Sequence, residues 1–348
     1  MTQSGGQHST PTDLDMTVDE EIARVEFGRP HVVILGAGAS LAAFPDGDGT
    51  GRRLPVMSNF AEILGLEPQL DALGLDHRTR NFEDVLSDLV DSGANSDRVA
   101  AIEARIHDYF FAMRLPTEPT LYDYLVLSLR DKDVIATFNW DPLLFAACAR
   151  AHQAGIVPPR ILHLHGSVAV GWCHAHRTAG SSLATCSRCQ KRFEPVPLLY
   201  PVRRKNYSAH PYLSSAWSEL SNALKNAWIL TVFGYSAPSS DVDAVAMLTE
   251  AWGPATSREL EETEIIDIRA ESELRQTWSP FIHTHHYRVE RDFFQSWLAH
   301  HPRRSCEAMW AQLMECRIVS KNSLPRVDSY GDLVDSIRPL LAGELKAR

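Results

Sequence analysis

One short segment constrains the fold of this chain more than any other. Residues 31–35 are apolar and mostly β-branched, and the turn Gly36-Ala37-Gly38-Ala39-Ser40 follows without a break. A buried strand that runs into a glycine turn and a small-residue helix start is the opening of a nucleotide-binding βα unit. The glycines would permit positive φ angles and let a phosphate approach the backbone amides. We therefore expect residues 36–40 to line a phosphate-binding turn.

Apolar runs return later in the chain and alternate with helical patterns. They cover residues 134–137, 161–164, 228–233, 264–268 and 283–289. Most of these runs end in polar residues or glycine, and the carboxyl ends of parallel strands form the edge of a sheet where ligands bind. This alternation predicts an α/β fold with a Rossmann-like, doubly wound, mostly parallel sheet.

The cysteines are unevenly distributed, which points to a metal site. Cys173-His174-Ala175-His176 and Cys186-Ser187-Arg188-Cys189 form a C-x2-H and C-x2-C pair with nine residues between them. Thiolates and imidazole at this spacing can close a tetrahedral zinc site, and a reducing compartment disfavours disulfides. We expect a zinc-ribbon-like module with structural zinc on Cys173, His176, Cys186 and Cys189. His174 is an alternative fourth ligand, and a metal-free hairpin is the other interpretation.

These patterns divide the chain into expected regions. Residues 60–130 have a helical pattern, in which one apolar face is formed by Val99, Ile102, Ile106, Tyr109, Phe110 and Met113. Side chains at this spacing are typical of a helix packed on a core. We expect an unstructured segment at 1–25, a main domain at 26–300, a zinc module within it at 169–200, and a helical segment at 301–348.

Composition and charge exclude several classes of protein. The chain is 44% hydrophobic and 22% charged, with a formal net charge of −10, which argues against broad binding to nucleic acid or an anionic membrane. Its apolar runs are far shorter than the roughly 18 residues that a membrane span needs. The polar N-terminus lacks signal-peptide features, so we expect a cytoplasmic protein. The basic run at residues 203–205 is either a solvated loop or a contact to a phosphate or partner.

The glycine turn alone does not specify a function. It lacks the third glycine of G-x-G-x-x-G, and no acidic residue ends an obvious second strand about 20 residues later. An ordinary dehydrogenase is therefore disfavoured.

An ordered set of motifs resembles the sirtuin superfamily over residues 32–243. The glycine turn is followed by Thr137-Phe-Asn139-Trp-Asp141, by His165-Gly-Ser, by the Cys/His cluster, and by Gly234-Tyr235-Ser236 with Asp241. The resemblance implies that NAD binds to these segments, with its pyrophosphate on the turn. It implies that Asn139 orients the ribose or an attacking water, that Asp141 lies near the nicotinamide, and that His165 is the general base.

The chemistry of these residues agrees with the resemblance. Loss of nicotinamide leaves an oxocarbenium-like ribose, which a nearby carboxylate and amide can stabilise and position. A histidine has a pKa near neutrality and can accept a proton from water or a ribose hydroxyl. His163 alternates with His165 and should point to the other face, so we interpret it as structural.

Within the superfamily, the sequence is similar to the bacterial NAD-hydrolase branch associated with anti-phage defence. Residues 195–207 and the FGYS-x4-D pattern carry this likeness, and the FRS motif of deacylases is missing after residues 45–46. We expect hydrolysis of NAD to ADP-ribose and nicotinamide. The alternatives are an NAD-dependent protein deacylase or ADP-ribosyltransferase, and a non-catalytic module that binds NAD or ADP-ribose. A homo-oligomer or a regulatory partner protein is also expected.

Overall fold

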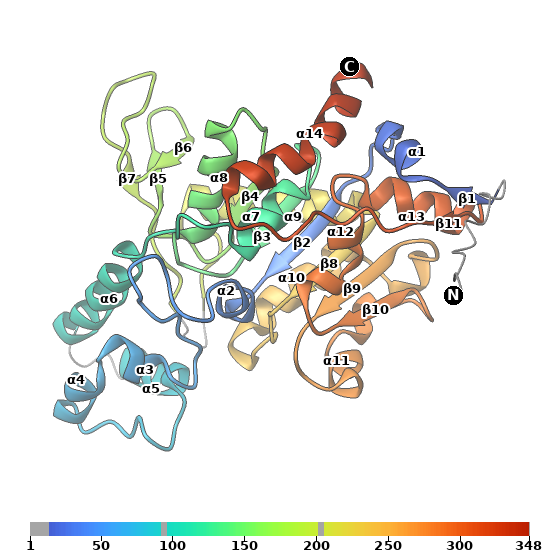
Figure 1. Ribbon diagram of the computed structural model, residues 1–348. Helices are drawn as coiled ribbons and strands as arrows, with labels where there is room; N and C mark the ends of the chain where they lie inside the picture. The colour runs from blue at the N-terminus through green and yellow to red at the C-terminus, as the bar shows by residue number, and fades with distance from the viewer. Residues whose placement is uncertain (1–13, 92–95, 201–204, 348) are drawn as a thin grey trace, which may run out of the picture.

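A parallel sheet forms the centre of the molecule in the computed structural model, which describes residues 14–91, 96–200 and 205–347 (Figure 1). Within these residues the sheet has six strands, in the order β10 (Tyr287–Glu290), β9 (Glu262–Ile266), β8 (Ile229–Phe233), β2 (His31–Leu35), β3 (Val134–Thr137), β4 (Arg160–His163). Every pairing is parallel. The chain proceeds from β2 to β3 and β4, then crosses to β8, β9 and β10. This order confirms the predicted doubly wound α/β class and puts its switch point beside β2.

Helices cover both faces of the sheet. Val33 and Leu35 of β2 pack with α7 (Leu121–Leu127) and α8 (Leu143–Gln153) in one core cluster. Val32 and Ile34 pack with α9 (Pro211–Asn226) and α10 (Val242–Trp252) in another. Successive side chains of a strand point to opposite faces, so the apolar run of β2 supplies both cores.

The strands β9 and β10 differ in position from the predicted runs at 264–268 and 283–289. β9 begins at Glu262 because its polar side chains are buried with partners: Glu262 accepts from Arg288, and Thr263 donates to the carbonyl of Phe281. Ile268 belongs to no strand and is 83% exposed. Apolar patterning alone could not locate a strand whose first residues are polar.

Residues between β2 and β3 are mainly helical. The helices are α2 (Ala37–Ala43), α3 (Phe60–Leu64), α4 (Glu67–Ala72), α5 (Phe82–Asp91), α6 (Ser96–Phe111) and α7. Ile102, Ile106 and Phe110 are buried on one face of α6, as the spacing predicts. Between α2 and α3, the Asp48 carboxylate accepts backbone N–H bonds from Thr50, Arg52 and Arg114, which fixes the long loop that follows α2.

A small antiparallel sheet follows β4 and projects from one side of the molecule (Figure 1). In the described residues it has three strands, in the order β6 (Thr178–Ser181), β5 (Val170–Cys173), β7 (Glu194–Pro195). Cys173, Cys186 and Phe193 form their own small buried cluster there. This sheet is the module that the cysteine spacing predicted.

The two ends of the described chain lie side by side. β1 (Asp15–Met16) pairs in parallel with β11 (Ile318–Val319), and α1 (Val18–Ala23) packs against α14 (Tyr330–Ala347). The expectation of an unstructured segment at 1–25 is therefore wrong for residues 14–25, and residues 1–13 lie outside the described part. The reasons are a capping box between Thr17 and Glu20 and the burial of Met16.

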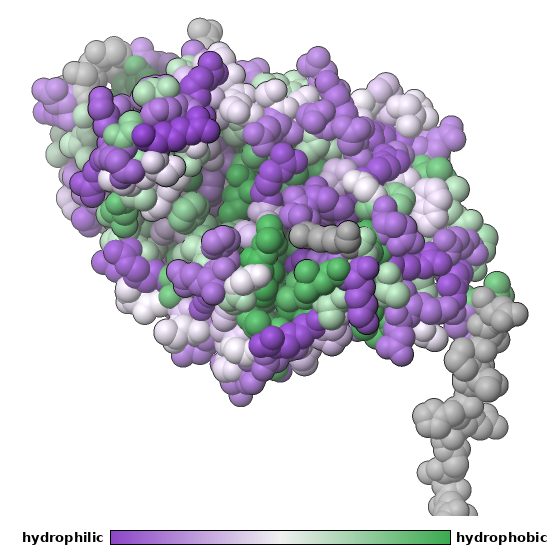
Figure 2. All heavy atoms as spheres, turned by 90° about the horizontal axis from the view of Figure 1, so that it is seen from above, coloured by the Kyte–Doolittle hydropathy of each residue, from purple (hydrophilic) through white to green (hydrophobic). Residues whose placement is uncertain are grey.

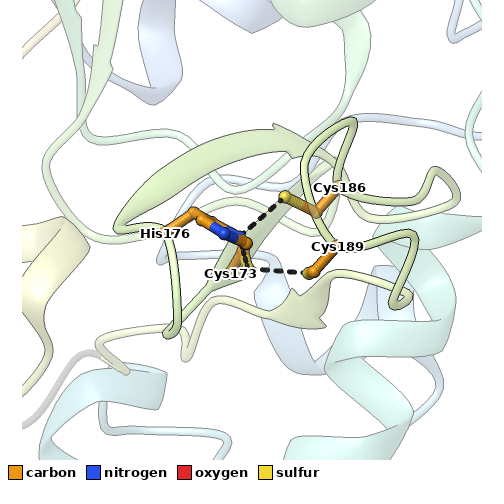
Figure 3. Close-up of side chains that lie close together, drawn as sticks. All are labelled: Cys173, His176, Cys186 and Cys189. Atoms are coloured by element: carbon orange, nitrogen blue, oxygen red, sulfur yellow. Dashed lines mark hydrogen bonds between the residues drawn. The ribbon is translucent and has the colours of Figure 1, made fainter.

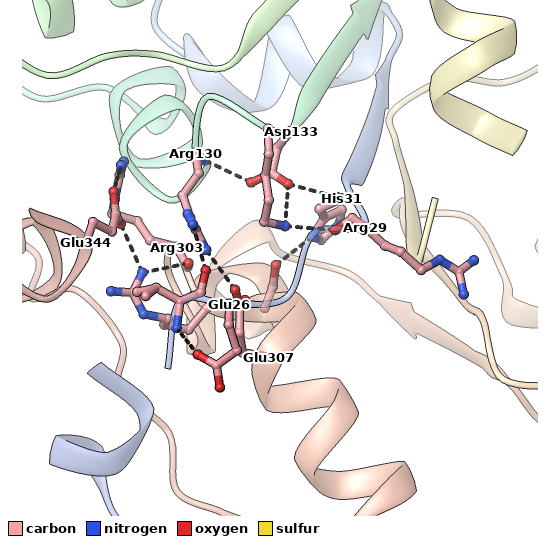
Figure 4. A network of polar contacts seen from close by, with 12 residues as sticks. Glu26, Arg29, His31, Arg130, Asp133, Arg303, Glu307 and Glu344 are labelled. Atoms are coloured by element: carbon pink, nitrogen blue, oxygen red, sulfur yellow. Dashed lines mark hydrogen bonds and ion pairs between the residues drawn. The ribbon is translucent and has the colours of Figure 1, made fainter. Parts of the chain in front are cut away.

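The remaining elements are α11 (Glu271–Thr277), α12 (Trp297–His300), α13 (Ser305–Met314) and short 3-10 turns. Helix α13 lies at the amino end of the sheet, where Ser305 forms a hydrogen bond with His31 of β2. A network of buried charges joins this region, in which Arg303 and Arg304 both pair with Glu344 of α14, and Arg130 pairs with Glu307 of α13 (Figure 4). These ion pairs attach the C-terminal helices to the main sheet.

No helix in the described residues is both long and apolar enough to cross a membrane. Figure 2 shows one face of the molecule, on which hydrophilic side chains predominate and hydrophobic ones gather near the middle.

Candidate functional site

The segments that follow four strands meet at the carboxyl edge of the sheet. Gly36 donates from its backbone N–H to the carbonyl of Phe233, and Phe138 donates to the carbonyl of Leu35. Thr137 of β3 lies beside His163 of β4, so the next residues of both strands leave the sheet at the same level. The edge beside β2 therefore carries the glycine turn, the Thr137–Asp141 segment, His165 and the Gly234 turn.

Asn139 joins the glycine turn to a group of polar side chains, the asparagine cluster: Ser40, Tyr122, Asn139 and Asp141. Its Nδ2 lies 2.9 Å from the Gly36 carbonyl and 2.9 Å from Ser40 Oγ. Ser40 Oγ donates to Asp141 Oδ2 at 2.8 Å and lies 2.7 Å from the hydroxyl of Tyr122. Burial raises the pKa of Asp141. The cluster holds an amide and a carboxylate beside the start of α2.

Tyr122 is a member of this cluster that the sequence did not reveal. It lies in α7, within a run of apolar residues, and its ring packs edge-on against Phe44. Burial raises the pKa of its hydroxyl, so this group stays protonated and can donate a hydrogen bond. No motif distinguishes such a tyrosine from a core residue.

His165 belongs to a second group, the histidine cluster: His165, Lys205, Tyr235 and Asp241. Its Nε2 lies 3.7 Å from Asp241 Oδ1, and Lys205 Nζ lies 2.7 Å from the same oxygen. The hydroxyl of Tyr235 donates to Asp241 Oδ2 at 2.9 Å. Burial lowers the pKa of His165 to about 4, so its imidazole is neutral at pH 7.

The two clusters lie at the same edge but are not joined. Phe138 stacks on Tyr235 with ring centroids 4.1 Å apart, and its ring also contacts His165 at 4.7 Å. Among the described side chains, no hydrogen bond connects the asparagine cluster to the histidine cluster. Asp141, His165 and Asp241 are buried, whereas Ser236 is exposed. The predicted residues thus converge on one edge, and the protein's own side chains fill the space around them.

The glycines of the turn are required for a reason other than the expected one. Positive φ was expected at this turn, but Gly36 has φ −114° and neither Gly36 nor Gly38 is among the residues with positive φ. A Cβ on Gly36 would lie 2.5 Å from the Gly234 carbonyl oxygen, and one on Gly38 would lie 2.9 Å from Gly234. Gly234 itself has φ +60°. The glycines therefore allow the two turns to pack backbone to backbone, and Gly38 N–H donates to Gly234 O.

A hollow lies next to the histidine cluster. It has a volume of about 500 Å³ and is lined by Lys205, Asn206, Tyr207, Ser208, Ser214, Trp217 and Met247. Tyr207 separates it from His165, with ring centroids 5.8 Å apart. Lys205 is the described residue of the basic run, and it is buried in an ion pair rather than solvated; residues 203 and 204 lie outside the described part.

An acidic residue follows β9. Asp267 comes after Ile266, whose carbonyl accepts from the N–H of Gly234. Its carboxylate is paired with Arg269 at 2.9 Å. The sequence rule looks about 20 residues beyond the glycine turn. Asp267 instead follows a strand far along the chain, which β8 separates from β2 in the sheet.

The Cys/His cluster has the geometry of a metal site. The ligand atoms of Cys173, His176, Cys186 and Cys189 all lie within 4.8 Å of one another (Figure 3). His176 Nδ1 lies 3.6 Å from Cys173 Sγ and 3.5 Å from Cys186 Sγ. A tetrahedral zinc with bonds of about 2.3 Å separates its ligands by about 3.8 Å, so these residues fit the ion. Hydrogen bonds from backbone amides lower the pKa of Cys186 to about 6, which favours the thiolate.

The geometry also shows which of His174 and His176 can be the fourth zinc ligand. The side chain of His174 is 51% exposed and lies 3.5 Å from Glu194, outside the group. His176 is therefore the fourth ligand candidate. With four protein ligands no position stays open for a substrate, which is typical of a structural zinc site.

Comparison with known proteins gives matches only among solved structures. No protein-family model and no curated protein sequence matches the chain. A Sir2 homologue mutant in complex with ADP-ribose is 14% identical, with coverage of 93% of this chain and 97% of that chain and a TM-score of 0.42. A complex of a Sir2 homologue with NAD is 15% identical, with 87% and 93% coverage and a TM-score of 0.33.

Proposed function

We propose that this chain is an NAD hydrolase that breaks the bond between nicotinamide and ribose. The observation that carries the proposal is the position of Asn139, whose amide contacts both Gly36 and Ser40 at the switch point of the sheet. Ligands of open α/β sheets bind at this point. The order of motifs and the convergence of their side chains support the assignment.

The proposed reaction is NAD⁺ with water to ADP-ribose, nicotinamide and a proton. The bond from ribose C1′ to the nicotinamide nitrogen breaks, its electron pair leaves with nicotinamide, and a water oxygen bonds to C1′. Asn139 orients the ribose or the water, and the Asp141 carboxylate faces the developing positive charge. The proton goes to His165, which is neutral at pH 7 and can accept it.

The proposal requires the site to open. His165 and Asp141 are buried, Lys205 and Tyr207 line the neighbouring hollow, and the ring of Tyr207 packs on that of His165. A dinucleotide must therefore displace side chains, so we propose that turnover depends on a conformational change. A homo-oligomer or a regulatory partner protein is a candidate trigger.

The test is to incubate the purified chain with NAD and to measure the release of nicotinamide by chromatography. Asn139→Ala and His165→Ala should each lower the rate by about 100-fold or more, because each removes a group that acts on the reacting atoms. Asn222→Ala and His152→Ala alter exposed residues of the same types and should keep the wild-type rate. Equal rates in all four variants would contradict the proposal.

A second candidate is binding of NAD or ADP-ribose without turnover. The burial of His165 and Asp141 favours it, because both groups are already enclosed by protein atoms. Calorimetry separates the two functions. The second candidate would be supported if the chain binds NAD but releases no nicotinamide over hours, even as a homo-oligomer or with its regulatory partner protein present.

We further propose that the enzyme acts in the cytoplasm and serves in anti-phage defence by consuming NAD. In this proposal residues 26–300 carry the reaction, including the helical insertion at 60–130 and the zinc module at 169–200. Bacteria that express the chain should survive phage challenge better than bacteria that express His165→Ala. Equal survival at equal protein levels would contradict this role.

A further inference from the structure

Lys205 reaches into the candidate site from the segment that precedes α9. Its side chain is only 2% exposed, and its ammonium lies 2.7 Å from Asp241 Oδ1 and 3.0 Å from the carbonyl of Ser240. A lysine is rarely buried to this extent unless it is paired. The pairing of the Lys205 ammonium with Asp241 therefore accounts for the burial of this lysine.

Each oxygen of the Asp241 carboxylate already accepts a hydrogen bond from a side chain other than His165. Oδ2 accepts from the hydroxyl of Tyr235, and Oδ1 accepts from Lys205. His165 Nε2 lies 3.7 Å from Oδ1, is buried and has no hydrogen-bond partner. A buried ring nitrogen without a partner is costly, and here an acceptor lies just beyond bonding distance.

We propose that Asp241 is the positioning residue of His165, and that Lys205 competes with His165 for the Asp241 carboxylate. The inference rests on the proposed function, because it gives His165 its role as base. In the described arrangement Lys205 holds Oδ1. When Lys205 withdraws, its positive charge no longer opposes that of His165, and Nε2 can approach Oδ1 and donate a hydrogen bond to it. This bond orients the ring and stabilises the imidazolium that forms when His165 takes a proton.

The charges around His165 agree with this competition. Burial lowers the pKa of His165, the Asp241 carboxylate raises it, and the Lys205 ammonium lowers it. Tyr207 and Tyr235 also lie on this side, and burial raises the pKa of both hydroxyls, so they stay neutral. The Asp243 carboxylate acts on Tyr207 through space. Glu83 of α5 interacts with Lys205 and Asp241 through space. Lys205 is thus the one cation in the described surroundings that opposes protonation of His165.

Nuclear magnetic resonance titration of the full chain, labelled at histidine and without NAD, tests the competition. The His165 signal is assigned by its loss in His165→Ala. Lys205→Met should raise the pKa of His165 by about one unit, because the opposing cation is gone, and Asp241→Asn should lower it. Lys205→Arg keeps the charge and should leave the pKa within a few tenths. The same pKa in Lys205→Met and wild type would overturn the proposal.

Further measurements distinguish a failure of the competition from a failure of the proposed function. Circular dichroism and the thermal midpoint show whether Lys205→Met is folded, and Lys205→Gln replaces it if the methionine variant is not. The pH profile of nicotinamide release should shift to match the His165 pKa in each variant. If the pKa shifts but wild type releases no nicotinamide, the competition stands and the proposed function fails. If nicotinamide is released but the pKa does not shift, the competition fails alone.

Discussion

His163 and His165 show how two histidines two positions apart acquire different roles. Both are buried, but His165 lies beside a carboxylate, whereas neither ring nitrogen of His163 has a partner. Burial alone lowers the pKa of His163 to about 4. The interpretation of His163 as structural agrees with these surroundings, although its unpaired nitrogens make it a costly core residue.

Replacing His163 should therefore stabilise the protein. The pKa of His163 is about 4 when folded and 6.5 as the ordinary value, so the folded state binds fewer protons between these pH values. Stability consequently falls as pH drops from 6.5 to 4. His163→Leu should raise the free energy of unfolding by about 1–2 kcal/mol at pH 7 and by more at pH 5. Denaturant unfolding at both pH values measures this.

In His163→Leu the free energy of unfolding should depend less steeply on pH than in the wild type, but the dependence should not vanish. His31 is also buried with a pKa lowered to about 4, mainly by burial, and contributes with the same sign. An unchanged slope, or a loss of stability at both pH values, would mean that the His163 ring makes favourable contacts that outweigh its unpaired nitrogens.

At the scale of elements, the contact between the glycine turn and the Gly234 turn positions the asparagine cluster. Gly36→Ala should destabilise the protein by about 3 kcal/mol, because its Cβ would lie 2.5 Å from backbone atoms that cannot move freely. Gly28→Ala is the matched control, since no atom lies within 4 Å of its added Cβ. Thermal unfolding compares the two. Equal midpoints would show that the turns can separate without cost.

Folding of the zinc module should depend on its metal, whereas folding of the six-stranded sheet should not. Cys186→Ser, or a strong chelator, should remove hydrogen-exchange protection from β5 and β6 while β2 and β8 stay protected, because the small sheet has only a minor core of its own. Cys316→Ser changes an exposed cysteine and should have no effect. Loss of protection throughout the six-stranded sheet would contradict this separation.

The elements differ in how far the sequence could predict them. β2 and β8 are apolar except for His31 and Thr231, and their strand type follows from that pattern. The start of β9 and the roles of Lys205 and Tyr122 depend on partners distant in the chain, which local patterns do not contain. The metal ligands could be predicted because chelation requires fixed spacing within one short segment.

At the scale of the whole molecule, buried ion pairs join the C-terminal helix α14 to the segment that precedes α13. Glu344 binds both Arg303 (Figure 4) and Arg304. The side chains of the two arginines are 3% and 0% exposed. Removing one partner of a buried pair leaves an uncompensated charge. The position of α14 therefore depends on one carboxylate that two guanidinium groups share.

Glu344→Gln should cost about 3–5 kcal/mol, since both arginines would stay buried without a counter-charge. Asp335→Asn in the same helix removes an exposed ion pair with Arg338 and should change stability by at most about 0.5 kcal/mol. Denaturant midpoints of the two variants compare the effects. A small cost for Glu344→Gln would mean that water reaches the two arginines.

The whole molecule brings an amide, a carboxylate and a histidine to one sheet edge, and we propose that they hydrolyse NAD without an acylated substrate. This proposal is tested by the yield of nicotinamide and ADP-ribose from NAD, with and without an acyl-lysine peptide. We expect equal amounts of both products, with no requirement for the peptide. Release of nicotinamide only with the peptide, together with acylated ADP-ribose, would contradict it and identify a deacylase.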